Sequence, residues 1–231
     1  MSLMKIKVSN MSGKLKNIQA LNSNTLSNLF CQKENQSNNP DKICTICYSF
    51  YMLQTFRKNC EDAWEHNSVM LSTGLYTVSD FVSMKIKFKN DIFRIHGHGE
   101  FINQTHLHNI CNLSFAYPQI TFAVWSKRID LVRKFKKWLD GKGYIFPNNL
   151  ILIYSNPKIN NVMTKIPHPF HKVFNNVSKK HELENCSGQK CDECRLCYSF
   201  DKKVNIIVEN TKEYVKRNNL RDENLSINSI N

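Results

Sequence analysis

The amino-acid sequence predicts an α/β protein built on a parallel sheet. Short apolar segments at 92–95, 120–125 and 150–154 each end in polar residues. Between them, the segments 103–115 and 129–139 carry apolar residues at the three- and four-residue spacing of helices. This alternation is typical of βαβ units, because parallel neighbouring strands need a crossover of about a dozen residues or more.

The length of the chain limits how these units can be arranged. Eight βα units typically need about 250 residues, and the chain has 231. We therefore expect a partial (βα)6 TIM-like barrel or an open parallel sheet, with a doubly wound sheet as the competing arrangement. Further strands are expected at 172–174 and 204–208, the second followed by a helix over 211–220.

One domain is expected over residues 1–220, followed by a flexible tail over 221–231. Polar, Asn-rich residues predict a loop over 32–42, and apolar spacing predicts helices over 48–65 and 79–87. In order, the expected parts are an N-terminal hairpin (1–30), a cysteine loop (31–47), βα units (48–180), a cysteine-rich C-terminal loop (181–200), and a final strand and helix (201–220).

The composition is that of a globular protein with excess positive charge. Hydrophobic residues make up 41% of the chain and aromatics 11%, which excludes a chain that is disordered throughout. Apolar runs are far shorter than the roughly 20 residues that span a bilayer, and no secretory signal is visible, so we expect a soluble cytoplasmic protein without a membrane partner. The net charge of +13 favours an anionic partner such as nucleic acid, although AT-rich codon bias toward Asn, Lys and Ile explains it equally well.

The nine cysteines are the most informative residues of the sequence. Their odd number and two-residue spacings are more typical of metal binding in a reducing compartment than of disulfides. Four of them form a C-terminal cluster with the spacing Cys-x4-Cys-x2-Cys-x2-Cys: Cys186, Cys191, Cys194 and Cys197. Four thiolates so close together predict one zinc ion or one iron–sulfur cluster, with reduced structural cysteines as the alternative.

Three more cysteines form an N-terminal group: Cys31, Cys44 and Cys47. The segment 44–50 (CTICYSF) matches the segment 194–200 (CRLCYSF) at five of seven positions, which strengthens the interpretation of both as metal-binding. Three cysteines would hold an iron–sulfur cluster with one iron open for chemistry. Alternatively, the pair in 44–50 joins the C-terminal cysteines, or packs without metal near Cys60.

The strand predicted at 92–95 runs into Arg-Ile-His-Gly-His-Gly-Glu at 94–100. Because alternate residues of a strand share a face, four side chains are expected to point together into the barrel mouth: Arg94, His96, His98 and Glu100. Buried charged groups need a partner, for which a ligand or a metal is suited. Two histidines and a carboxylate also resemble the facial triad of non-haem iron sites. A turn with two solvent-facing histidines is the alternative.

Polar residues at the carboxyl ends of strands are further candidates for cofactor contacts, because parallel α/β folds bind ligands at that edge. The candidates are Gly99, Glu100, Lys127, Arg128, Ser155 and Asn156. The basic helix over 129–139 is expected to be a solvated face, although Trp125 and Trp138 would also allow it to follow phosphates and stack a base.

Five features together resemble the phage gene-product-88-like family, which occurs in phages and mobile elements. They are Cys-x2-Cys-Tyr at 44–48, Arg-x-His-x-x-Gly-Glu at 94–100, Trp-Ser-Lys-Arg at 125–128, Tyr-Ser-Asn-Pro at 154–157, and the closing cysteine cluster. In this order they cover most of the chain. The resemblance implies a phage-type protein in the cytoplasm of a host cell, and it implies ancestry rather than an activity.

The chain also resembles, more loosely, the radical S-adenosylmethionine superfamily of partial (βα)6 barrels. In those enzymes three cysteines after the first strand hold a [4Fe–4S] cluster, and a Gly-Gly-Glu motif at the second strand holds the amino group of S-adenosylmethionine. Cys44, Cys47 and Tyr48 match the end of the cysteine loop. Gly99 and Glu100 match the end of the second motif.

Two positions depart from that superfamily's pattern. Pro40 stands where the first cysteine is expected, so Cys31 would serve through a longer loop. His98 stands in place of the first glycine of the second motif. The four C-terminal cysteines would resemble the site of an auxiliary cluster.

These observations lead to two main hypotheses. In the first, the chain is an iron–sulfur enzyme with up to two clusters, acting on an unknown substrate such as nucleic acid. The N-terminal cysteines hold the catalytic cluster, Glu100 holds the amine of S-adenosylmethionine, and Arg94, His96 and His98 shape the pocket. In the second, the chain is a non-catalytic zinc protein that binds nucleic acid. A hydrolase or oxygenase with His96, His98 and Glu100 as metal ligands is a third.

Overall fold

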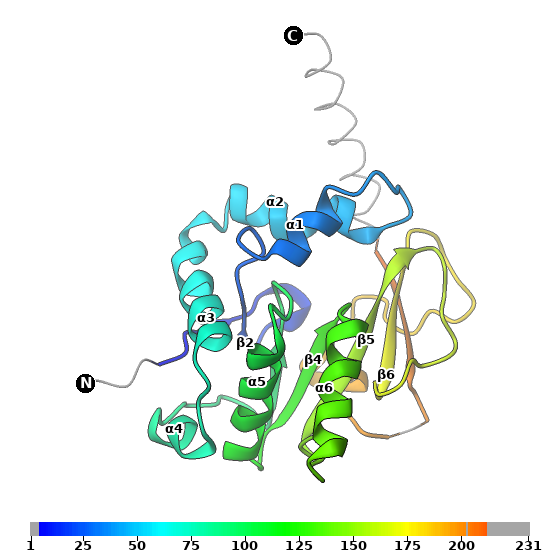
Figure 1. Cartoon of the computed structure of the whole chain (residues 1–231). Helices are drawn as coiled ribbons and strands as arrows, with labels where there is room; N and C mark the ends of the chain where they lie inside the picture. Colours follow the sequence, from blue (N-terminus) through cyan, green and yellow to red (C-terminus); the bar gives the residue numbers. More distant parts are fainter. Residues whose placement is uncertain (1–4, 202, 212–231) are drawn as a thin grey trace.

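The computed structural model describes residues 5–201 and 203–211, and within them seven strands form one sheet. The strands follow one another in space in chain order, and every neighbouring pair except the first is parallel (Figure 1). They are β1 (Val8–Asn10), β2 (Gln19–Leu21), β3 (Ile92–Ile95), β4 (Thr121–Ser126), β5 (Leu150–Ile159), β6 (Lys172–Val177) and β7 (Ile206–Asn210).

The order of the strands decides between the expected arrangements. A doubly wound sheet reverses its strand order at a switch point, whereas β2 to β7 advance in one direction without a reversal. Because parallel crossovers are right-handed, such an order places the connecting helices on one face of the sheet. The fold is therefore an open, singly wound α/β sheet with the strand order of a partial (βα)6 barrel, and the prediction of the fold class is confirmed.

The helices cover one face and one end of this sheet. In Figure 1, α3, α5 and α6 lie in front of the strands, while α1 and α2 lie across the top, where the parallel strands end. The helices are α1 (Leu29–Asn35), α2 (Tyr48–Gln54), α3 (Glu61–Thr73), α4 (Val78–Ser83), α5 (Gln104–Ala116), α6 (Ile129–Gly141) and α7 (Cys191–Cys194), with short 3-10 turns η1 (Gly13–Leu15), η2 (Ile43–Ile46), η3 (Lys58–Cys60) and η4 (Leu196–Tyr198).

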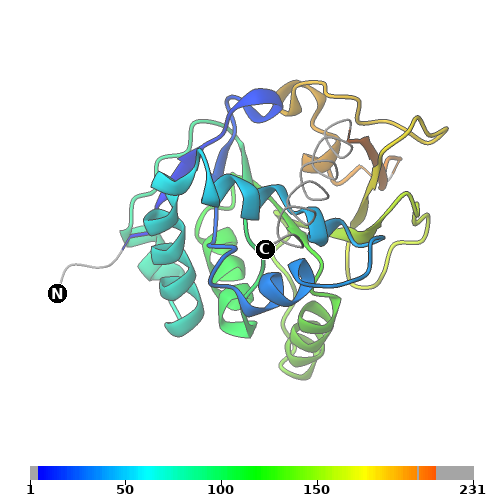
Figure 2. The same ribbon diagram turned by 90° about the horizontal axis from the view of Figure 1, so that it is seen from above.

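Alternation along the strands separates two apolar cores. Phe93, Phe122 and Leu152 face the helices and belong to the larger, outer core. Trp125 and Ile153 point the other way and belong to a smaller, inner core. Figure 2 shows α7 and η4 on this inner side, opposite α5 and α6. The cysteine-rich segment thus takes the place that a helix layer would have in a doubly wound fold.

The N-terminal hairpin and the five predicted strands are confirmed, but three predicted segments differ. The helix predicted over 79–87 is the shorter α4, which ends at Ser83. The loop predicted over 32–42 begins as helix, because α1 continues to Asn35. The helix predicted over 48–65 is interrupted at Thr55, whose φ of −122° and ψ of −112° leave the helical region. Here the chain turns from the top of the sheet onto its outer face, and Phe56 is 63% exposed.

The helix and tail predicted beyond residue 211 lie outside the described residues. None of the helices in the described part of the chain is long and apolar enough to cross a membrane.

Candidate functional site

The segment 94–100 does not continue β3. The strand ends at Ile95, and His96 and Gly99 have φ angles of 60° and 89°, in the left-handed region. The two-residue alternation therefore stops, and the prediction that all four charged and polar side chains point together is wrong. Of the four, His96 and Glu100 do approach each other, with His96 Nδ1 4.0 Å from Glu100 Oε1. Arg94 alone keeps its strand orientation, on the inner face of the sheet, where its guanidinium stacks on an aromatic ring of β4.

The two histidines of this segment lie in different surroundings. His96 donates from Nδ1 to the carbonyl oxygen of a β4 residue, and its ring packs 5.4 Å from that of His106 on α5. His98 stacks on Trp64 of α3 at 4.3 Å and shares a hydrogen bond with Ser49 Oγ. Among the described residues, no three His, Cys, Asp or Glu side chains stand close enough to hold a metal ion, so the facial triad is not assembled.

Burial makes these histidines sensitive to acid. It lowers the pKa of His96 and of His98 to about 3, and for His98 the cations of Arg57 and Arg94 act in the same direction. The unfolded chain, with a histidine pKa near 6.5, binds more protons between these values than the folded chain does. The free energy of unfolding should therefore fall as the pH drops from about 6.5 toward 3, by about 1.4 kcal/mol per pH unit for each histidine.

Urea titrations at a series of pH values, with the parent and a His98→Gln variant, measure this contribution. Taking the difference between the two proteins cancels the carboxyl groups, including Glu100, whose raised pKa acts in the opposite direction. The variant should lose less stability between pH 6.5 and 4. Parallel pH profiles would contradict the burial of a neutral His98.

Glu100 connects the loop after β3 with the end of β4. Its carboxylate accepts hydrogen bonds from the backbone N–H groups of Phe101 (2.8 Å) and Lys127 (2.7 Å). The residue as a whole is only 4% exposed. Burial raises the pKa of Glu100, and the positive charge of Lys127 opposes this shift. The hydroxyl of Ser126 also donates a hydrogen bond to this carboxylate. A carboxylate has about four acceptor positions, so these three contacts leave capacity for one further donor.

Gly99 allows the loops after β2 and β3 to touch. A Cβ atom at this position would lie 2.1 Å from Ser23 Oγ and 2.4 Å from the backbone oxygen of Ser23. Together with its positive φ, this leaves room for glycine alone. Gly99 thus shapes the site by allowing this contact, and direct contact with a cofactor stays a prediction.

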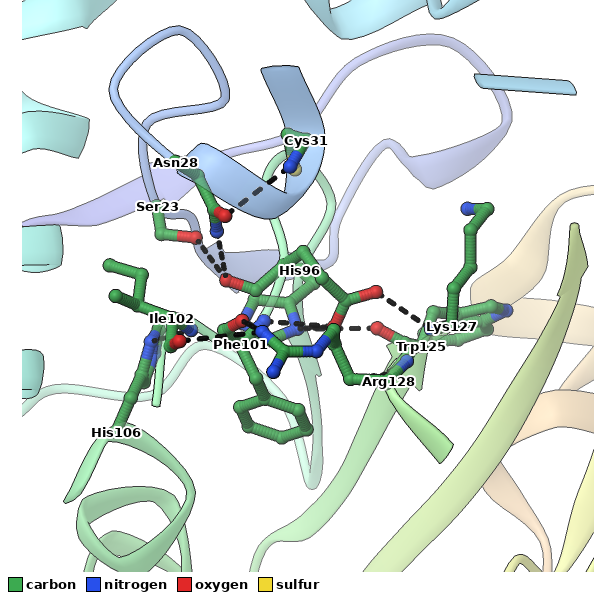
Figure 3. Close-up of polar contacts among 12 residues, drawn as sticks. Ser23, Asn28, Cys31, His96, Phe101, Ile102, His106, Trp125, Lys127 and Arg128 are labelled. Carbon is green, nitrogen blue, oxygen red and sulfur yellow. Dashed lines mark hydrogen bonds and ion pairs between the residues drawn. The ribbon is translucent and has the colours of Figure 1, made fainter. Parts of the chain in front are cut away.

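A buried polar segment after β2 is the part of the site that sequence reasoning missed. Asn28 caps α1 by accepting hydrogen bonds from the N–H groups of Phe30 (3.0 Å) and Cys31 (3.4 Å). Its side-chain amide donates to the backbone oxygen of Glu100 at 3.0 Å. Asn28 therefore places Cys31 next to the Glu100 loop, as Figure 3 shows. The available signal was an Asn directly before an apolar pair, which is a typical helix start.

The three N-terminal cysteines come together at this end of the sheet. Cys31 lies on α1, Cys44 on η2, and Cys47 directly before α2. The side chain of Asn35 donates to the backbone oxygen of Cys44 at 2.8 Å and joins α1 to η2. Burial raises the pKa of Cys31 well above its ordinary value, and the charges of Glu100, Cys47 and Cys44 raise it further. These groups therefore lie within electrostatic reach of one another.

Lys127 supplies positive charge to the same place. Burial lowers its pKa, but Cys44, Glu100 and the two other thiols together raise it above its ordinary value. Burial also raises the pKa of Cys44, to about 11, and Lys127 limits that rise. Lys127 is expected at a ligand-binding edge of the sheet. In the structure, thiols and a carboxylate act on its side chain at that edge.

The other strand-end candidates have contacts within the protein. Arg128 donates to the backbone oxygens of Phe101 and Ile102 at 3.2 and 3.4 Å, and so holds the loop that follows Glu100. Asn156 lies at the irregular part of β5, where its side chain bonds to Asn175 and to the backbone.

Those contacts give Asn156 a role in the fold. Neighbouring Ser155 is 8% exposed. A contact between either residue and a cofactor stays a prediction.

The C-terminal cysteines form a second, separate group under the inner face. Cys191 and Cys197 pack against the inner core, and the backbone N–H of Cys186 donates to Val208 O at 3.0 Å, beside β7. The charged groups that act on Cys197 are Arg94 and the other three C-terminal cysteines. The two cysteine groups therefore do not merge into one site, which answers the question that the sequence left open.

An open, singly wound α/β sheet with thiols, a carboxylate and a lysine gathered at its carboxyl end defines an α/β protein with a thiol-lined site. A family model described as Gene product 88 matches residues 5–185, and the chain belongs to this family. The match confirms the resemblance to the phage family, and it ends one residue before Cys186. No curated protein and no solved structure matches the chain.

Proposed function

We propose that this protein is an iron–sulfur enzyme similar to the radical S-adenosylmethionine proteins. One observation carries the proposal: three cysteines from separate segments lie within electrostatic reach of one another over the carboxyl ends of a singly wound sheet of six parallel strands. In parallel α/β folds this edge is where ligands bind and chemistry takes place. Cys31, Cys44 and Cys47 would hold the cluster.

The chemistry of these donors fits a cluster. Thiolates are the usual ligands of iron–sulfur clusters, and three of them leave one iron open. Because burial raises the pKa of the Cys31 and Cys44 thiols, cluster binding must displace their protons and will be pH-dependent. As no three such donors converge closely enough in the described residues, α1 and η2 must draw together when a cluster binds. Lys127 would then lie beside the negatively charged thiolates.

The surrounding residues would hold the cofactor and keep the site in shape. When bound, the cluster would supply the electron for cleavage of S-adenosylmethionine. Glu100 has acceptor capacity left for an ammonium group, and its position is fixed by two backbone N–H groups. Asn28 and Arg128 support the loops on either side of it. Arg94 lies on the inner face below this site.

Binding of S-adenosylmethionine to the anaerobically reconstituted protein tests this assignment. A Glu100→Ala variant should lose binding while its iron and sulfide content is unchanged, because Glu100 contacts the cofactor and no cysteine ligand is altered. Asp130→Asn is the matched control, since Asp130 is an exposed carboxylate at the same edge that pairs with Arg128. Equal binding by the parent and the Glu100→Ala variant would overturn the role of Glu100.

A second candidate function, nucleic-acid binding, is favoured by the surface between α5 and α6. A cavity of about 340 Å³ lies there, and its lining includes the exposed rings of Phe115, Trp138 and Tyr144. Lys134 and Lys142, both exposed, come four residues before and after Trp138 and so share its side of the helix. Aromatic rings that stack bases, next to lysines that contact phosphates, are typical of single-strand binding surfaces.

Trp125 has no part in this surface. It is 7% exposed and lies in the inner core, so the expectation that Trp125 and Trp138 act together is wrong. Trp138 instead has His108 and Phe135 as ring neighbours, at 5.1 and 5.3 Å.

Replacing Trp138 by Ala should weaken binding of a single-stranded oligonucleotide about 5-fold or more, since one stacked base contributes about 1–3 kcal/mol. Lys134→Gln and Lys142→Gln should each reduce the slope of log affinity against log salt by about 0.7. Lys58→Gln, on the exposed turn η3, is the control and should leave the slope unchanged. Absence of binding to single strands at low salt would exclude this candidate.

A further inference from the structure

Arg94 is a cation on the inner face without a carboxylate partner among the described residues. Its guanidinium lies 3.8 Å from the centre of the Trp125 ring, and its Nε is buried without a hydrogen-bond partner. Cation–π contact offsets part of the loss of hydration. A buried charge nevertheless remains unfavourable unless a negative group balances it.

The groups around this guanidinium are phenols and thiols. Burial lowers the pKa of Arg94, while Tyr198, Tyr48, Cys197 and Cys191 raise it. Protonated thiols and phenols are neutral and cannot balance a cation. Four cysteines bound to a metal would, because metal ligation deprotonates them.

The four C-terminal cysteines act electrostatically on one another, and Cys191 and Cys197 both pack against the inner core. Burial raises the pKa of Cys197 to about 12, Arg94 opposes this shift, and Cys186, Cys191 and Cys194 add to it. The segment that carries them includes a tight turn at Arg195, whose φ is 53°. Cys191 and Cys194 precede this turn and Cys197 follows it, which brings the later cysteines back toward the earlier ones.

The cysteine segment is anchored at both ends of its turn. Arg195 donates two hydrogen bonds to Asp91, at 2.6 and 2.8 Å, and Asp91 directly precedes β3. Asn17, just before β2, donates to Asp192 at 2.9 Å. These contacts hold the segment toward the strand starts, at the end of the sheet opposite the Glu100 loop.

We propose that Cys186, Cys191, Cys194 and Cys197 form a second metal centre, a closed four-thiolate site whose counter-ion is Arg94. Four thiolates around Zn²⁺ carry a net charge of 2−, and four thiolates around a [4Fe–4S]²⁺ cluster carry the same charge. Either centre offsets the positive charge of Arg94. A site with four protein ligands leaves no open position for a substrate, so it serves structure rather than catalysis.

The role of the centre would be to close the inner face of the open sheet. Tyr198, which is 6% exposed, follows the last cysteine and packs on Trp125, with ring centres 5.8 Å apart. The inner core otherwise has no helix layer in the described part of the chain beyond α7 and η4. As no three donors converge closely enough without metal, binding would draw the segment together and tighten this contact.

The centre is tested in a chain whose first site has been removed by Cys31→Ser, Cys44→Ser and Cys47→Ser, so that failure of the proposed enzyme function does not affect the outcome. Titration with Co²⁺ should give one ion per chain with the intense absorption of thiolate ligation. Adding Cys191→Ser and Cys197→Ser should abolish this absorption, whereas adding Cys60→Ser should leave it unchanged. Equal Co²⁺ absorption with and without Cys191 and Cys197 would overturn the proposal.

The role of Arg94 as counter-ion is tested by substituting Arg94 in the same Co²⁺ titration. Arg94→Met should weaken Co²⁺ binding at least tenfold, because the dianionic centre loses its counter-ion, and Arg94→Lys should restore most of the affinity. Equal affinities of all three proteins would overturn the role of Arg94.

A second measurement does not depend on substituted cysteines in the C-terminal centre, so it remains informative if those variants fold poorly. It also identifies the natural metal. Alkylation of the parent chain, mapped by mass spectrometry, should show these four thiols protected until a chelator removes the metal; rapid labelling of all four before chelation would contradict the proposal. In the chain lacking the first site, zinc without colour and iron with sulfide both support a four-thiolate centre and distinguish its two forms.

Discussion

Replacing Gly99 by alanine should destabilise the protein by about 3 kcal/mol or more. The positive φ of 89° costs a residue with a Cβ about 1–2 kcal/mol. The added Cβ would also lie 2.4 Å from the backbone oxygen of Ser23, which cannot move without shifting the loop after β2. Such a loss corresponds to a fall in Tm of about 6–12 °C for a chain of this size.

Thermal and urea unfolding of the Gly99→Ala variant measure this effect. Gly141→Ala is the matched control, because Gly141 ends α6 and a Cβ there would meet nothing within 4 Å. The control should be as stable as the parent or slightly more stable, since alanine has the higher helix propensity. Equal stability of both variants would show that the two loops do not touch as the structure describes.

A Cys44→Ser variant should lose most of the iron and sulfide that the reconstituted first site retains. A serine hydroxyl is a poor substitute for a thiolate as a cluster ligand, and two remaining cysteines, Cys31 and Cys47, do not suffice for a cluster with three protein ligands. The expected loss is close to complete for the first cluster.

Cys60→Ser is the control for this loss. Cys60 ends η3 and belongs to neither cysteine group. Both variants are made in a chain that also carries Cys191→Ser and Cys197→Ser, so that only the first site can hold a cluster. Cys60→Ser should leave the iron and sulfide content per chain unchanged. Retention of the first cluster in Cys44→Ser would show that Cys44 is not a ligand.

The parts of the fold that depend on burial along a strand could be predicted from the sequence. The apolar run at 92–95 coincides with β3, and the run at 150–154 coincides with the start of β5. Each is buried on both faces, and such strands are nearly continuous apolar runs. β2, with only three residues, follows from the hairpin expected at the N-terminus rather than from a signal of its own.

Only part of the site can be predicted from the sequence, because the orientations of several of its side chains depend on loop conformation. The gathering of Cys31 with Cys44 and Cys47 agrees with the proposed ligand set. The orientations of His96 and His98 could not be read from alternation, since the left-handed φ of His96 ends the strand period. The same holds for the buried polar residues after β2, whose partners lie far away in the sequence.

The most direct test of the first site is the metal content and visible spectrum of a chain purified without oxygen and lacking only the C-terminal centre, through Cys191→Ser and Cys197→Ser. We expect a brown protein with about four iron and four sulfide per chain, as for one [4Fe–4S] cluster. A colourless protein without iron, or iron that persists after Cys31, Cys44 and Cys47 are also replaced, would contradict it.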